Sequence, residues 1–271
     1  MKDMFFLSGL PRTGSTVLSA LLNQNPDVYC SHYTNLLPSM ANYQKQINTY
    51  ESVNTGVGVN SYYQVLQNMG SSFYSHIDKP YVIDKSRGWG SSESLPFANL
   101  LSRSIKIIFP VRPILEILSS FISIIENKEN NFIDYGIREL NYPVYRPAND
   151  VRCDYLMSHI GPIGLHMPIL EFALRPENKE KFFFLNYDEL LSSPEDTLGK
   201  LYAFLGIDSY KHNFESIAEA DSSNDLQAFG VPDLHTVRPL LQKTSKPYEE
   251  VLSKYVIDKY KNALDFTGLF S

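Results

Sequence analysis

The chain has 271 residues, of which 43% are hydrophobic and 20% charged, as is usual for a globular protein with a sizeable core. Its formal net charge of −6 argues against sequence-independent binding to nucleic acid, so a polyanionic ligand would have to be held by local cations. Its 2 cysteines are too few for a disulfide framework or a metal site. The longest apolar region, residues 105–125, carries charges and prolines that a membrane span would not tolerate. We therefore expect one cytoplasmic domain, residues 1–271, with neither a nucleic acid nor a membrane as partner.

The opening of the chain predicts a strand, a glycine-bearing loop and a helix. Met4 to Ser8 is a short apolar run, and apolar residues recur at helical spacing from Ser15 to Leu22. The loop between them, Gly9-Leu-Pro-Arg-Thr-Gly-Ser-Thr16, has the spacing of a P-loop, but Ser15 replaces the lysine and Arg12 is the only cation. A helix start offers unpaired N–H groups to an anion. The loop therefore predicts a phosphate site, and the missing lysine argues against a metal-bound triphosphate.

Along the rest of the chain, apolar runs alternate with helical patterns. We expect further strands at 27–30, 81–84, 105–111 and 181–185, and helices at 35–48, 61–73, 114–125, 194–205 and 248–264. Polar composition predicts loops at 49–60 and 127–150 and an irregular segment at 208–246, while 153–174 has helical character interrupted by prolines. This alternation indicates an α/β fold, a three-layer domain with a central, mostly parallel sheet. In such sheets ligands bind beyond the carboxyl ends of the strands.

A second cationic position lies at the end of the strand at 105–111. Arg112 follows this strand, and Ser120 comes about two helical turns later. A guanidinium suits a phosphate group and a serine hydroxyl can add a donor. Without the loop these would be an ordinary surface arginine and a packing serine. Together with the loop, they predict a ligand that carries two separate phosphate groups.

Three motifs in this order resemble the sulfotransferase family. They are Phe5-Phe-Leu-Ser-Gly-Leu-Pro-Arg-Thr-Gly-Ser-Thr16, Phe109-Pro-Val-Arg-Pro113 with Ser120, and Phe184-Leu-Asn-Tyr-Asp-Glu-Leu190 running into Leu201-Tyr-Ala-Phe-Leu-Gly-Ile207. The nearest likeness is to the tyrosylprotein sulfotransferase branch and its bacterial relatives. The resemblance implies transfer of a sulfuryl group from 3′-phosphoadenosine 5′-phosphosulfate (PAPS) to a small-molecule, glycan or peptide acceptor, leaving 3′-phosphoadenosine 5′-phosphate (PAP).

The resemblance also assigns roles to individual residues. The 5′-phosphosulfate would be cradled by Arg12, Thr13, Gly14, Ser15 and Thr16, and the 3′-phosphate held by Arg112 and Ser120. Tyr187 matches a family position near the 3′-phosphate, although a core tyrosine would fit the pattern equally well. Lys246 resembles a late cofactor-side segment, although a single lysine is more often simply solvated. Lys85, which follows the strand at 81–84, would neutralise charge on the transferring group together with Arg12, without a metal.

The general base is where the sequence departs from the family pattern. The tyrosylprotein branch has a glutamate after the first helix, and alignment from Arg12 puts Tyr33 at that position, preceded by His32. We expect His32 to be the base, against the alternative of a structural histidine, with Asp84 and Glu93 in reserve. For the stretch from His235 to Pro239 we expect a loop with an incidental histidine, with a part of the cleft roof as the alternative. The loop at 127–150 is expected to set acceptor specificity.

Two other functions share these motifs. A P-loop kinase for a small metabolite would have the same loop and fold, but the missing loop lysine and Arg112, where a metal-binding acid could stand, disfavour it. A nucleotide-binding protein without catalysis would account for the missing glutamate. Magnesium dependence would identify the first, and tight binding of PAP without turnover the second.

Overall fold

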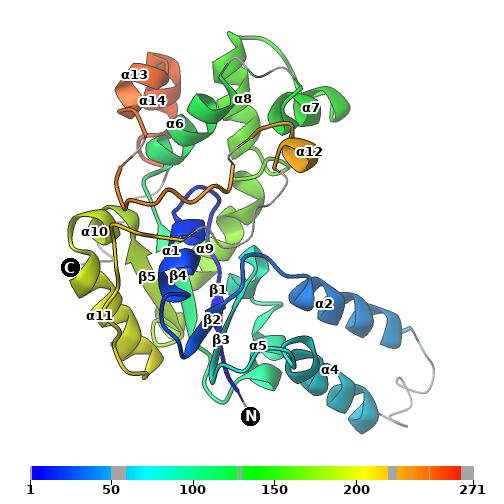
Figure 1. Cartoon of the computed structure of the whole chain (residues 1–271). Coiled ribbons are helices and arrows are strands. Elements are labelled where there is room, and N and C mark those ends of the chain that lie inside the picture. The colour runs from blue at the N-terminus through cyan, green and yellow to red at the C-terminus, as the bar shows by residue number, and fades with distance from the viewer. Residues whose placement is uncertain are drawn as a thin grey trace.

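The protein is built around one parallel sheet, as seen in a computed structural model that describes residues 2–49, 59–126, 128, 130–218, 225–232, 234–243 and 245–263 (Figure 1). Five strands in this described part form the sheet in the order β2-β3-β1-β4-β5, and every pairing is parallel. Their bounds are β1 Asp3–Leu7, β2 Val28–Cys30, β3 Tyr81–Lys85, β4 Ile107–Val111 and β5 Phe182–Asn186. The order reverses at β1, so the loop after this strand lies where ligands bind in open parallel sheets.

The two faces of the sheet are covered by different helices because side chains alternate along each strand. Phe5 and Leu7 of β1 pack with α1 (Ser15–Leu22), α10 (Tyr187–Ser192) and α11 (Pro194–Leu205). Met4 and Phe6 pack on the opposite face, with α5 (Leu95–Leu101), α6 (Ile114–Ile125) and α9 (Met167–Ala173). Figure 1 shows α1 and α11 on one side of the sheet. The predicted three-layer α/β architecture is therefore confirmed.

The remaining elements lie around this sandwich. They are α2 Leu36–Ile47, α4 Val59–Phe73, the 3₁₀ turns Arg87–Gly90, Gly164–His166 and Pro176–Asn178, α7 Phe132–Glu139, α8 Ala148–Met157, α12 Asp225–Phe229, α13 Tyr248–Val251 and α14 Lys254–Tyr260. Most of the predicted loop at 49–60, residues 50–58, lies outside the described residues.

The expected loop at 127–150 is wrong over much of its length. Among its described residues, α7 forms because the Asn131 side chain accepts hydrogen bonds from the N–H groups of Ile133 and Asp134, an N-cap that starts the helix. Pro147 does not prolong the loop but precedes the first turn of α8. Pro162 and Pro168 act as expected, since α8 ends before the first and the second lies in the first turn of α9.

The late segment, which we define as residues 231–246 without 233 and 244, crosses over the amino end of α1 (orange in Figure 1). Its far end leads into α13 and α14. There the buried Asp154 of α8 accepts hydrogen bonds from Tyr255 (2.9 Å), Lys259 (2.8 Å) and Tyr260 (2.7 Å) of α14. These contacts fix α14 against α8.

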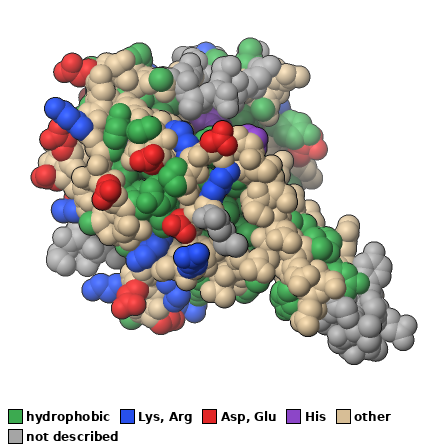
Figure 2. Space-filling model, turned by 60° about the horizontal axis from the view of Figure 1, so that its bottom comes forward, with side chains coloured by type: hydrophobic (Ala, Val, Ile, Leu, Met, Phe, Trp, Pro, Cys, Tyr) green, Lys and Arg blue, Asp and Glu red, His purple; other side chains and the backbone are tan. Residues whose placement is uncertain are grey.

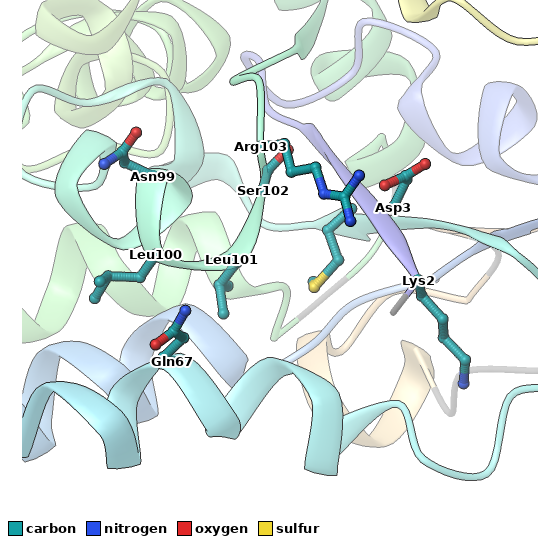
Figure 3. A pocket seen from close by; sticks show the side chains of 9 residues that line it. Lys2, Asp3, Gln67, Asn99, Leu100, Leu101, Ser102 and Arg103 are labelled. Carbon is teal, nitrogen blue, oxygen red and sulfur yellow. The ribbon is translucent and has the colours of Figure 1, made fainter. Parts of the chain in front are cut away.

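A pocket of about 230 Å³ lies at the amino end of β1, between α4 and α5, and is lined in part by Lys2, Asp3 and Arg103 (Figure 3). This is the edge of the sheet opposite to the loop after β1. Among the described residues, no helix is long and apolar enough to cross a membrane.

Candidate functional site

The loop from Gly9 to Thr16, called the phosphate loop below, has the conformation of an anion cradle. Gly9 (φ 126°), Arg12 (φ 65°) and Gly14 (φ 88°) all have left-handed backbone, which curls the loop tightly between β1 and α1. The Thr13 hydroxyl donates to the Leu10 carbonyl at 2.8 Å and braces the turn. The N-cap residue of α1 is Gly14, which has no side chain to accept from the first N–H groups of the helix, and the first turn of α1 has no acidic residue. The amino end of α1 is thus left for an anionic ligand.

Arg12 joins the phosphate loop to the next two elements. Its Nε donates to Ser120 Oγ of α6 at 3.2 Å, and its carbonyl accepts from the Arg112 guanidinium at 3.3 Å. A terminal nitrogen of Arg12 donates to the carbonyl of Leu234 in the late segment. Burial, and after it the charge of Arg112, lowers the pKa of Arg12 to about 10. Arg12 remains a cation at neutral pH, in a surrounding that favours an anionic partner.

The Arg112 guanidinium is held by a carboxylate of its own chain. Its Nε and one terminal nitrogen donate to Glu116 at 3.2 and 2.8 Å, and that nitrogen also donates to Ser245 Oγ at 2.8 Å. Lys243 donates to the other Glu116 oxygen at 2.8 Å. Although burial acts in the opposite direction, the hydrogen bonds from Lys243 and Arg112 lower the pKa of Glu116. The carboxylate is therefore ionised at neutral pH and accepts from two nitrogens of the Arg112 guanidinium.

Tyr187 connects the phosphate loop with Arg112. It is the first residue of α10, directly after β5, and its ring lies 4.9 Å from the Arg112 guanidinium carbon. A Cβ atom added to Gly14 would collide with this ring. The close approach requires glycine at position 14 and makes the Tyr187 ring a wall of the phosphate loop.

Lys85 enters the site from the end of β3. Its Nζ donates to Thr16 Oγ1 at 3.3 Å, and its backbone N–H donates to Ser31 Oγ at 2.7 Å. Burial lowers the pKa of Lys85 to about 8, and the charge of Arg87 acts in the same direction. The ammonium group therefore lies beside the phosphate loop, although it is carried by β3 and not by the loop itself.

Arg87 adds a further cation two residues after β3. Arg87 is exposed to solvent but is surrounded by many protein atoms, as in a cleft. This partial desolvation lowers the pKa of its guanidinium. Its carbonyl accepts from Ser8 at the end of β1, at 2.6 Å. Figure 2 shows histidine and basic side chains reaching the surface close together in the upper part of the view.

The late segment brings a second histidine to the site. The ring centroids of His235 and His32 lie 6.4 Å apart, with the planes at 72°. The Nδ1 of His235 is 2.7 Å from Asp225 Oδ1, and its backbone N–H donates to Asp225 Oδ2 at 2.6 Å. His32, expected from the sequence, and His235, expected to be incidental, therefore share one site.

The two reserve carboxylates lie elsewhere. Asp84 is completely buried and accepts hydrogen bonds from Thr34, Tyr74 and Trp89, so it ties β3 to its surroundings. Glu93 is exposed. Neither is arranged to take a proton from a substrate at the phosphate loop.

Lys246 is exposed, and its carbonyl accepts from Ser119 of α6 at 3.5 Å. Its neighbour Ser245, not Lys246, contacts Arg112. Sequence reasoning also missed Glu116, although it stands four residues after Arg112 at the spacing of a helical ion pair. No short-range signal marks Ser245, Asp225 or His235, because long-range packing brings them to the site.

Comparisons with known proteins agree with this arrangement. A family model described as "Sulfotransferase family" matches residues 4–212. A Caenorhabditis briggsae protein named "Putative protein-tyrosine sulfotransferase" is 38% identical over 56 residues, which are 21% of this chain and only 20% of that protein.

Two solved structures share the fold. The sulfotransferase domain from the curacin biosynthetic pathway aligns with 95% of this chain and 96% of its own, at 16% identity and a TM-score of 0.51. Mouse sulfotransferase SULT7A1, solved in complex with PAP, aligns with 96% of this chain and 82% of its own, at 15% identity and a TM-score of 0.52. Because the family match extends from β1 through α11 and covers both the phosphate loop and Arg112, the chain belongs to the sulfotransferase family.

Proposed function

We propose that this protein transfers a sulfuryl group from PAPS to the hydroxyl or amine of a small-molecule, glycan or peptide acceptor. The observation that carries the proposal is the hydrogen-bonded connection of Arg12 with Ser120 and Arg112. It joins the loop suited to a 5′-phosphosulfate with a second cationic group suited to a 3′-phosphate. Family membership supports the reaction class, and the two separate anion positions support the donor.

The residues present fit such a donor. The phosphate loop offers left-handed backbone, an uncapped helix start and the Arg12 cation, and the Tyr187 ring forms its wall. In this proposal Arg12 to Thr16 hold the phosphosulfate end. Arg112 and Ser120 hold the 3′-phosphate, with Tyr187 beside them and Ser245 and Lys246 from the late segment nearby.

PAPS, when bound, supplies an activated sulfuryl group whose leaving group is a phosphate. This chain has to stabilise the negative charge that builds up on the transferring group and on that leaving group. Arg12 and Lys85 provide two positive charges at the phosphate loop, and Lys85 is held there through Thr16. Their positions are set by β1 and β3, which pair along their whole length, so little reorganisation is needed.

Glu116 makes a prediction for cofactor affinity. Its carboxylate occupies the Arg112 guanidinium and would repel a 3′-phosphate there. Glu116→Gln keeps an oxygen acceptor but removes the charge, so PAP should bind more tightly, by about tenfold, which is about 1.4 kcal/mol. ADP, which has no 3′-phosphate, should bind equally to both proteins. Asp188→Asn is the matched control, because the half-exposed Asp188 side chain lies 3.9 Å from Lys243. Unchanged or weaker PAP binding in Glu116→Gln would contradict the competition.

The function is tested by calorimetric titration with PAP and with ADP, each with and without magnesium. We expect metal-independent binding of PAP that is much tighter than binding of ADP, followed by acceptor-dependent release of PAP from PAPS. Preference for ADP or ATP with magnesium would identify a kinase and overturn the proposal. Tight PAP binding with no turnover on phenols, sugars and tyrosine peptides would identify a nucleotide-binding protein without catalysis.

A further inference from the structure

The side chain of Asp225 fixes both the backbone and the ring of His235. One carboxylate oxygen accepts the His235 backbone N–H at 2.6 Å, and the other meets ring Nδ1 at 2.7 Å. Asp225 is 5% exposed, so water hardly competes for these bonds. Because an ionised carboxylate only accepts hydrogen bonds, Nδ1 must carry the ring proton. The neutral ring then has its lone pair on Nε2, the arrangement of a histidine oriented to take up a proton.

The backbone next to this ring is anchored to the phosphate loop. Arg12 donates to the carbonyl of Leu234, the residue before His235. The ring has neighbours on several elements: Phe229 of α12 at 5.5 Å between centroids, and His32 after β2 at 6.4 Å. Burial lowers the pKa of His235, Asp225 opposes this, and the charges of Lys85 and Arg12 lower it further. The ring is therefore neutral at physiological pH and lies within electrostatic reach of both cations.

We propose that His235, held by Asp225, is the general base that removes the proton from the acceptor hydroxyl. The inference rests on the proposed sulfuryl transfer. In the balanced step, the acceptor oxygen forms a bond to sulfur while the bond from sulfur to the 5′-phosphate oxygen breaks. The electron pair of the broken bond stays with the phosphate oxygen, and the acceptor proton passes to His235 Nε2 and later to solvent. Asp225 is a positioning residue that fixes the tautomer and stabilises the imidazolium.

This assignment replaces His32 as the expected base. The rings of His32 and His235 are in contact, so a substitution of either can disturb the other. Their roles are separated by measuring the turnover of each variant with acceptors of different acidity. A phenol that is already ionised needs no base, whereas a weakly acidic phenol does. The fall in turnover caused by removing a base therefore depends on the acidity of the acceptor, whereas the fall caused by disturbed packing is the same for both phenols.

The experiment measures PAP formation from PAPS with 4-methylphenol, with 4-nitrophenol and with water alone as acceptors. The variants are His235→Gln, Asp225→Asn and His32→Gln, with the exposed His159→Gln as matched control. His235→Gln should lower the turnover with 4-methylphenol by about 100- to 10,000-fold, and that with the more acidic 4-nitrophenol much less. Asp225→Asn should lower turnover too and move the acidic limb of the pH profile to lower pH, because its carboxylate raises the pKa of His235. PAP affinity, measured by calorimetry, should be retained in all four variants.

Two results would overturn the assignment while leaving the proposed function intact. One is unchanged turnover of His235→Gln with 4-methylphenol, and the other is an equal loss with both phenols, which indicates a structural role. If the unaltered protein forms no PAP with these acceptors, nor with the sugars and tyrosine peptides that test the proposed function, both proposals fail. A readout without turnover is the ¹⁵N spectrum of the histidine rings: His235 should be protonated at Nδ1 in the unaltered protein and shift toward the Nε2 tautomer in Asp225→Asn. A His235 ring protonated at Nε2 in the unaltered protein would exclude the hydrogen bond from Nδ1 to Asp225 on which the proposal rests.

Discussion

Lys85→Ala should lower the turnover of sulfuryl transfer by about 100- to 1,000-fold, the usual cost of removing one charge-stabilising donor from an active site. PAP affinity should fall much less, because PAP has no sulfuryl group for the ammonium to contact. The reason is the position of Nζ, which donates to Thr16 at the start of α1, where the transferring group would lie. Steady-state kinetics with PAPS, together with calorimetry with PAP, separates the two effects.

Lys85→Arg tests the charge itself. The pKa of Lys85 is lowered to about 8, so the free protein loses this charge as the pH rises above that value. The unaltered protein should therefore lose kcat/KM above about pH 8, whereas Lys85→Arg, which stays charged, should not show this loss. Lys79→Ala is the matched control, since Lys79 lies just before β3 at the opposite edge of the sheet. An unchanged rate in Lys85→Ala would remove Lys85 from the catalytic site.

Arg112→Ala should weaken PAP binding by about 1.5–3 kcal/mol, the range for a lost charge-assisted hydrogen bond, and ADP binding much less. The guanidinium is anchored between Glu116, Ser245 and the Arg12 carbonyl, so it is held rigidly where a 3′-phosphate would meet it. Calorimetric dissociation constants for both nucleotides give the difference directly.

Two further variants keep this result interpretable. Arg112→Ala leaves Glu116 without its arginine partner, and the double variant with Glu116→Gln removes that uncompensated charge. Arg103→Ala is the matched control. Arg103 lines the pocket at the amino end of β1, so the variant removes one arginine charge at the edge of the sheet opposite to the phosphate loop. Equal weakening of PAP and ADP in Arg112→Ala would refute the assignment of the 3′-phosphate to Arg112.

The sequence predicted those parts of the fold and site that depend on short stretches of chain. The strand–loop–helix opening was readable because Gly9 and Gly14 mark the turns and the apolar spacing changes between them. Arg112 was placed correctly just after β4 and Ser120 on α6, because each position follows from one strand or one helix alone. In contrast, the helix α7 was missed, since its start depends on the side-chain cap of Asn131 within a polar stretch.

The rest of the site depends on contacts between distant parts of the chain. Ser245 meets Arg112 across 133 positions, and the Leu234 carbonyl meets Arg12 across 222. Such pairs leave no local pattern in composition or spacing. His235 was therefore interpreted as an incidental loop histidine, although the fold carries it to the phosphate loop.

The late segment has a thermodynamic consequence for any ligand of this site. Leu234 accepts from Arg12 and Ser245 accepts from Arg112, so the chain itself already uses donors of both arginines. A ligand that takes those donors exchanges one set of hydrogen bonds for another, and the measured affinity is the difference between the two sets. The strength with which the late segment itself is held at Leu234 and Ser245 thereby enters the dissociation constant.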